Sequence, residues 1–190
     1  MAYATPAELQ TLMGRDDDPF TSGETARAVL LLDLATGAID GELGLAELGE
    51  SLELGVSTAE VDGTGTHLLL LPRWPVTAVE SVAVIDDLDE PADALTEDTD
   101  YRWSRHGQLR RLRRCWPRIE RAVEVVYTAG WDPIPNDVKG MCLRLASAGW
   151  DNIAGLESER LGDWSAKWSV PGMNLSTTDL RTLSLYRVRT

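Results

Sequence analysis

The chain has 190 residues, of which 43% are apolar and 26% are charged, the composition of an ordinary globular protein with enough length to bury a core. No run approaches the roughly 20 apolar residues that a membrane-spanning helix needs, which excludes such a span. The N-terminus lacks a basic region followed by an apolar one, so we expect no secretion signal.

The chain contains two cysteines, Cys115 and Cys142. Two are too few for a disulfide framework, and these two are too isolated in the sequence for a zinc site. We therefore expect both thiols to be reduced and the protein to be intracellular.

Charge is distributed unevenly along the chain, whose net charge is −13. Residues 1–100 hold 22 Asp and Glu against three arginines, a balance of −19. Residues 101–190 hold nine acids against 15 bases, a balance of +6, and eight arginines lie between residues 102 and 121. A bipolar subunit of this kind suits head-to-tail association into a ring or stack, although unequal charge alone does not establish one.

Two capping boxes predict helices near the N-terminus. The first spans residues 5–8 and has proline at the first helical position, and Gly14 ends the short helix. The second, at residues 21–24, begins a helix of about 16 residues that is apolar nearly all round between residues 28 and 35, so it should be the central buried helix. Glycine and acidic residues predict broken helix or loop from residue 36 to 65.

Strand composition dominates the middle of the chain. Val123, Val125 and Tyr127 share one face of the segment with the strongest β composition. Four or five short antiparallel strands are expected, formed by residues 68–71, 81–85, 101–103, 108–112 and 122–128.

Helical patterning returns after Pro135, with Asn136 as the N-cap. A third capping box, at residues 176–179, begins a short C-terminal helix. Between them, Trp164 and Trp168 share a face whether their segment is helix or strand. The apolar stripe of the first of these two helices consists of Val138, Met141, Cys142, Leu145 and Ala146.

These elements predict an α+β fold with a small helical bundle core, an inserted antiparallel β-module and an extended C-terminal arm with a short helix. The expected parts are an N-terminal helical part at residues 1–65, the β-module at 66–130, and a C-terminal helix, loop and arm at 131–190. Together they should form one folded unit.

Residues suited to catalysis or to holding a cofactor are scarce. The two histidines, His67 and His106, have no Cys or Ser at a spacing that indicates a nucleophile. The acidic run at residues 86–90 lacks the glycine and the ligand spacing of a calcium loop. The glycine-rich residues 62–66 precede a strand, whereas a phosphate loop follows one. We expect no catalytic residue, no metal site and no cofactor.

The arginines between residues 102 and 121 are the feature best suited to binding a partner. Trp103 and Trp116 lie among them and could stack on bases, yet the sequence pI of about 4.5 is unlike that of a nucleic-acid-binding domain. Charge pairing with a protein is favoured over nucleic-acid contact and over a solvated sheet edge that only prevents aggregation. Four of the arginines are expected to face solvent, so that reversing their charge would weaken docking without unfolding: Arg110, Arg111, Arg113 and Arg114.

The order of several motifs resembles that of head–tail connector proteins of long-tailed bacteriophages, particularly those of actinobacterial hosts. The resemblance covers roughly residues 65–170, and the N-terminal helices fit it in kind. The motifs are LPRWPVT at residues 71–77, VESV at 79–82, Tyr101, VEVVYTAGW at 123–131, IPNDV at 134–138 and ESERLGDWS at 157–165.

The resemblance implies a structural virion protein without catalytic residues. Such an adaptor forms a ring, a dodecamer in the virion, beneath the portal protein, extends the DNA channel and receives the next connector or tail component. DNA would pass without specific binding, which an acidic or neutral lumen favours because phosphate contacts supply most non-specific affinity. The implied location is the neck of the virion after synthesis in the host cytoplasm, with no membrane partner.

The sequence leaves three alternatives open: a nucleic-acid-binding module that uses the arginines at 102–121, an enzyme whose site is built from distant residues, and a tail-completion protein elsewhere in the neck. The residues expected to contact a neighbouring subunit or partner combine arginines with aromatic anchors. They are Arg102, Arg105, Arg110, Arg111, Arg113, Arg114, Trp164, Trp168, Arg181 and Tyr186.

Overall fold

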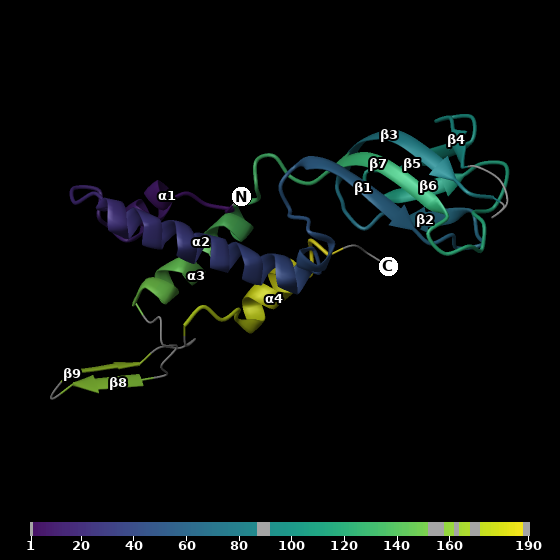
Figure 1. Ribbon diagram of the computed structural model, residues 1–190. Helices are drawn as coiled ribbons and strands as arrows, with labels where there is room; N and C mark the ends of the chain where they lie inside the picture. The colour runs from purple at the N-terminus through teal and green to yellow at the C-terminus, as the bar shows by residue number, and fades with distance from the viewer. Residues whose placement is uncertain (1, 87–91, 152–157, 162–163, 168–171, 188–190) are drawn as a thin grey trace. The chain divides into compact units, whose positions relative to one another are not determined.

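The computed structural model describes residues 2–86, 92–151 and 172–187, and the backbone of residues 158–161 and 164–167 (Figure 1). The chain divides into two compact units. A helical unit consists of residues 1–51 and 134–187, and a β unit consists of residues 52–133. Within the described residues, no helix is both long enough and apolar enough to cross a membrane. The α+β fold class expected from the sequence is confirmed.

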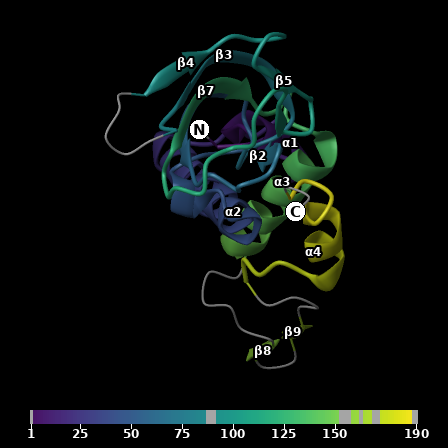
Figure 2. The ribbon, with the colours of Figure 1, turned by 90° about the vertical axis from the view of Figure 1, so that its right-hand side faces the viewer.

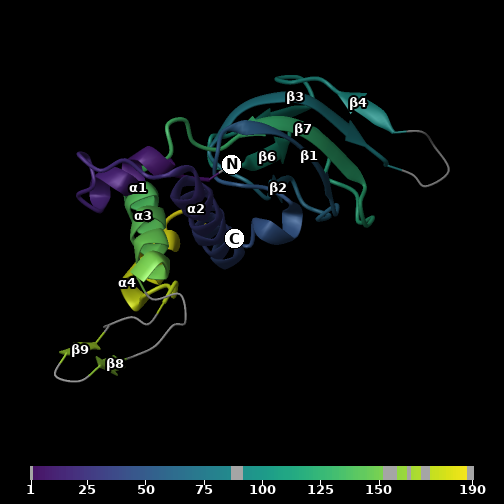
Figure 3. The same cartoon turned by 60° about the vertical axis from the view of Figure 1, so that its left-hand side comes forward.

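Three helices of the helical unit begin where their capping boxes predict. Side chains of Thr5, Thr21 and Ser176 each accept a hydrogen bond from the backbone three residues later, and all three capping boxes are formed. Helix α2 lies along α3, as Figure 3 shows. The elements are α1 (Pro6–Leu12), α2 (Ser22–Leu43), the short 3-10 helix η1 (Ala46–Leu48), α3 (Asn136–Asp151) and α4 (Thr177–Leu183).

The apolar stripe predicted for α3 is confirmed, because all five of its residues are buried. Cys142 of this stripe lies within 3.6 Å of the Thr36 hydroxyl on α2. The N-terminal segment is tied to the same place, since the backbone N–H of Tyr3 donates to Thr36 at 3.1 Å and the Tyr3 hydroxyl donates to Asp40. The core of the helical unit therefore joins the N-terminal segment and α3 to α2.

Helix α2 differs from its prediction in length and in burial. It has 22 residues, where about 16 were expected from the pattern. Its buried face, which includes Leu31, Leu32 and Ile39, packs against the other helices. The opposite face is apolar but open, with Val29 and Leu30 exposed by 43% and 58%. Only one side of α2 is covered because the remaining helices of this small unit pack against that side.

The C-terminal part of the helical unit contains a hairpin and α4. Strands β8 (Ser158–Leu161) and β9 (Trp164–Lys167) pair antiparallel. Helix α4 is attached to α3 by an ion pair between Arg144 and Asp179. The backbone carbonyl of Glu42, at the end of α2, accepts a hydrogen bond from Arg187 at 2.6 Å. The short C-terminal helix is thus part of the helical unit.

Two antiparallel sheets make up the β unit (Figures 1 and 2). One has the strand order β1-β7-β3-β4 and the other the order β2-β6-β5. The strands are β1 (Gly55–Val61), β2 (Leu68–Leu70), β3 (Val76–Val84), β4 (Asp93–Leu95), β5 (Tyr101–Trp103), β6 (Gln108–Arg111) and β7 (Val123–Ala129).

Both sheets contribute side chains to one hydrophobic core. In β7 the predicted shared face of Val123, Val125 and Tyr127 is confirmed, because all three residues are fully buried. Leu69 and Leu109, which are partners in the smaller sheet, are buried in the same core. Residues that alternate with these point outward, as the two-residue period of a strand requires.

The expectation of broken helix or loop for residues 36–65 is wrong in two places. Helix α2 continues to Leu43, and Gly55–Val61 forms β1, which pairs with β7 over its whole length. The predicted β-module began at residue 66 and therefore left out this strand. Strand β1 has few apolar residues, so its pairing with β7 forms it, and no local hydrophobic pattern marks it.

The two ends of the β unit are hydrogen-bonded to each other. The backbone N–H of Trp131 donates to the carbonyl of Leu52 at 2.8 Å, and that of Leu54 donates to Trp131 at 3.1 Å. Arg73, which is 3% exposed, donates to the carbonyl of Glu53 at 2.6 Å and to that of Ala129 at 3.0 Å. These bonds satisfy backbone acceptors where the chain enters and leaves the sheet.

Replacing Leu145 with Ala should lower the free energy of unfolding by about 2–5 kcal/mol, because Leu145 is fully buried in the helical core. Leu12, which is 56% exposed on α1, is the matched control, and Leu12→Ala should change stability by less than about 0.5 kcal/mol. Urea denaturation followed by circular dichroism measures both. Equal effects would mean that α3 does not supply this core.

Replacing Gly130 with Ala should destabilise the β unit by more than about 1 kcal/mol. The residue has φ 118°, and a methyl group there would overlap the backbone of Glu53. Gly140, with open space beside it on α3, is the control, and Gly140→Ala should stabilise by about 0.5–1 kcal/mol. Opposite signs in thermal unfolding are expected, and two stabilising substitutions would contradict the close approach at Gly130.

Candidate functional site

Alternation along β6 divides its side chains between two environments. Gln108 and Arg110 are exposed, whereas Leu109 and Arg111 are buried. Arg110 is paired in register with Leu68 of β2 and with Arg102 of β5, so these three side chains form one row across the outer face of the smaller sheet. The sheet thereby displays two guanidinium groups beside one apolar side chain.

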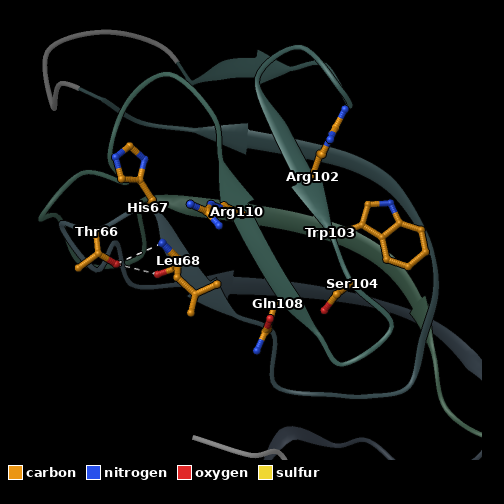
Figure 4. Close-up of a pocket in the computed structure, with 8 residues that line it drawn as sticks. All are labelled: Thr66, His67, Leu68, Arg102, Trp103, Ser104, Gln108 and Arg110. Carbon is orange, nitrogen blue, oxygen red and sulfur yellow. Dashed lines mark hydrogen bonds between the residues drawn. The ribbon is translucent and has the colours of Figure 1, made fainter.

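An open hollow of about 460 Å³ lies on this outer face (Figure 4). At one side the hydroxyl of Thr66 is hydrogen-bonded to both backbone groups of Leu68, at 3.2 and 3.0 Å. These local bonds fix the backbone where β2 begins. The hollow is lined by Thr66, His67, Leu68, Arg102, Trp103, Ser104, Gln108 and Arg110.

The arginines of this surface differ in how far they are neutralised. Arg102 forms an ion pair with Asp98 at 2.9 Å, in which both side chains are exposed. Arg114 lies 3.6 Å from Asp86. Arg105, Arg110 and Arg113 are exposed and form no ion pair with any residue that the structure describes. We call these exposed residues the basic surface: Arg102, Arg105, Arg110, Arg113 and Arg114.

Arg111 was expected to face solvent with its neighbours, and this is wrong. Its side chain is 6% exposed and donates two hydrogen bonds of 2.7 Å to the two carboxylate oxygens of Asp86. A third bond of 3.1 Å reaches the carbonyl of Cys115, and the guanidinium lies 5.5 Å from the ring centre of Trp116. The two-residue period from Leu109 is the sequence signal that places Arg111 inward.

The Arg111–Asp86 pair affects ionisation. Hydrogen bonds from Arg111 lower the pKa of the Asp86 carboxyl, and partial burial opposes that effect more weakly. Asp86 is the first residue of the acidic run at 86–90, whose other members lie outside the described residues. Its carboxylate is therefore committed to an arginine within the β unit.

The other predicted contact residues belong to the helical unit. Arg181 is exposed on α4. Tyr186 is half-buried, and its hydroxyl donates to the Asp137 carboxylate at 2.7 Å, while burial and that bond raise the pKa of Tyr186. Trp164 lies in β9, where the backbone alone is described, and Trp168 lies outside the described residues.

The basic surface and the hollow present hydrogen-bond donors suited to binding an anionic group. Guanidinium, amide and hydroxyl donors surround the hollow, and arginines recognise carboxylates or phosphates through charge-assisted hydrogen bonds. The ring nitrogen Nδ1 of His67 lies 3.1 Å from the carbonyl of Arg111. Across the described part of the chain, no three His, Cys, Asp or Glu side chains are grouped so that they could hold a metal ion.

Replacing Arg111 with Met should lower the free energy of unfolding by at least about 1–3 kcal/mol, because Asp86 loses its hydrogen bonds beside the core. Arg114→Met is the matched control, since that exposed arginine should contribute no more than about 1 kcal/mol. Denaturant titration followed by tryptophan fluorescence measures both. Equal stability of the two variants would show that the ion pair is dispensable.

The same pair predicts a pH dependence. Because the folded-state pKa of Asp86 is lowered, its stabilising contribution is complete above the unfolded-state pKa of about 3.9 and is lost as the pH falls toward the folded-state pKa. The difference in unfolding free energy between the wild type and Arg111→Met should therefore shrink as the pH is lowered below about 4. A difference that stays constant down to strongly acid pH would contradict the assignment.

Neither the family models nor the curated proteins contain a match to this chain. Solved structures do share its fold. A chain from the neck of an empty gene transfer agent (GTA) particle, computed with C6 symmetry, aligns with a TM-score of 0.61 and 19% identity over 98% of this chain and 91% of its own length. A chain from the virion of a native GTA particle aligns with a TM-score of 0.60 and 19% identity, over 98% of this chain and 93% of its own length. A chain from the neck of a native GTA particle, computed with C12 symmetry, aligns with a TM-score of 0.53 and 18% identity, again over 98% of this chain and 93% of its own length. The fold of this chain, over nearly all of its length, is therefore one found in GTA particles.

Proposed function

We propose that the protein is a structural subunit of the neck of a tailed bacteriophage or a related particle, a head–tail connector. The observation that carries this proposal is the likeness in fold over 98% of the chain and 91% of a chain from a GTA particle neck. A match of this extent includes the helical unit, the β unit and their order along the sequence. The motif order at residues 71–77, 123–131 and 134–138 supports the same assignment independently.

In this proposal the subunit works as one segment of a ring, a dodecamer in the virion. The support is that two of the similar chains come from necks computed with C6 and C12 symmetry. A ring requires each copy to offer two different, complementary faces. The ring lies beneath the portal protein, continues the DNA channel and presents a surface to the next connector or tail component. The protein is made in the host cytoplasm and is incorporated into the virion neck.

The basic surface serves partner recognition in this assembly. Arg110 is exposed, and no described side chain neutralises it. An acidic surface on a neighbouring subunit or another virion protein would complete the charge balance of this face. Complementary charge chooses partner and register more than it adds affinity, and exposed pairs contribute only about 0–1 kcal/mol each, so several must act together.

The neck assignment is tested by producing particles in cells that lack this chain. Filled heads and separate tails that fail to join are expected, and supplying the chain from a plasmid should restore joined particles that contain it. Electron microscopy and mass spectrometry of the particles read out both results. Normal joining without the chain, or its absence from complemented particles, would overturn the assignment.

The role of the basic surface is tested by reversing the charge of four of its five exposed arginines, in the variant Arg102→Glu, Arg110→Glu, Arg113→Glu and Arg114→Glu. Arg111 is left intact because its substitution would disturb the core. Folding should survive, whereas incorporation into particles should fall and joined particles should come apart at lower salt. The matched control carries Lys at the same four positions and should assemble, because the charge is kept.

Unchanged incorporation of the Glu variant would overturn the role in partner recognition and would mean that these arginines only form a solvated surface. Purified protein is also mixed with labelled duplex DNA at physiological salt. Binding that the Glu variant loses would favour the nucleic-acid-binding alternative over protein pairing.

A further inference from the structure

Helix α2 presents an apolar face that no described residue covers. Val29, Leu30 and Leu34 are exposed by 43%, 58% and 53%. Their positions, together with Asp33 and the exposed Gly37, recur at helical spacing on the side opposite the buried residues of α2. We call these five residues the outer face of α2.

This face is unusual because a helix that is apolar all round is normally buried on all sides, whereas α2 is buried on one side alone within the described residues. Contiguous apolar surface that stays exposed on a protein marks an interaction site. Gly37 has open space beside it, so a partner could approach the backbone closely there. The outer face of α2 therefore has the properties of an interface that another element covers.

A second exposed apolar surface lies on and just after α4. Leu180 and Leu185 are exposed by 38% and 60%, and Arg181 is exposed between them. The buried side of the same segment consists of Asp179 and Leu183, which hold α4 in the helical unit. We call Leu180, Arg181 and Leu185 the outer face of α4.

The two outer faces are complementary in charge as well as apolar. Asp33 is the single charge on the outer face of α2, and Arg181 is the single charge on that of α4. Neither forms an ion pair with any residue in the described ranges. One face thus carries leucines around an unpaired acid, and the other carries leucines beside an unpaired base.

We infer that the outer face of α2 in one copy of the chain packs on the outer face of α4 in the next copy. This inference rests on the proposed ring function. A cyclic ring is built from heterologous contacts between two different surfaces, which these faces supply. The leucines bury apolar area, and the Asp33–Arg181 pair fixes the register of the contact. Both faces belong to the helical unit, so one compact unit carries the two sides of the contact.

The contact is tested by photo-crosslinking in assembled particles. A benzophenone side chain replaces Leu30, and the variant is the only source of the chain during assembly. Irradiation should give a product of two copies, and mass spectrometry of its peptides should place the link within residues 177–187 of the second copy. The control carries the benzophenone in place of Ala7, an exposed residue of α1 outside both faces, and should give no such product.

The outcomes separate this inference from the proposed function. Particles that contain the chain but link position 30 to another protein, or to a different segment of this chain, overturn the α2–α4 contact and leave the neck assignment standing. Particles without the chain overturn the neck assignment itself. Exchange of the two charges gives a second measurement: Asp33→Arg or Arg181→Asp alone should reduce incorporation several-fold, and the double variant should restore it. Absence of restoration would also count against the contact.

Discussion

A buried arginine must be neutralised before the smaller sheet of the β unit can form. The two-residue period of β6 sends Arg111 inward together with Leu109, and Asp86 supplies the neutralising charge by accepting two of its hydrogen bonds. The same period sends Arg110 outward, into a row with Arg102. Strand β6 therefore directs Arg111 to a structural role and leaves Arg110 exposed to a partner. Because Asp86 neutralises Arg111, the strand can form and display the basic surface on its outer side.

Local signals in the sequence predicted much of the helical unit. Capping boxes such as Thr5–Glu8 define helix starts through contacts three residues apart, and the stripe of α3 follows from a single helical period. The face of β7 that carries Val125 was predictable for the same reason. Such features depend on neighbours along the chain, so the sequence contains them without knowledge of the fold.

Features that depend on distant partners were missed. Strand β1 forms by pairing with β7, and its sequence GVSTAEV has no strong apolar alternation. The burial of Arg111 depends on Asp86, 25 residues earlier in the chain. The open face of α2 was also missed, because an apolar run indicates burial without saying whether the cover comes from the same chain or from another.

The nested order of the two units has a consequence for synthesis on the ribosome. Residues 52–133 of the β unit are contiguous, and their two ends are hydrogen-bonded to each other, so this unit has all of its strands before α3 has emerged. Helix α2, in contrast, must wait for α3 to cover its buried face. During that interval both sides of α2 are exposed to solvent, and at usual elongation rates of about 5–20 residues per second the interval lasts several seconds. The nascent chain is then a natural client for chaperones that bind apolar helices.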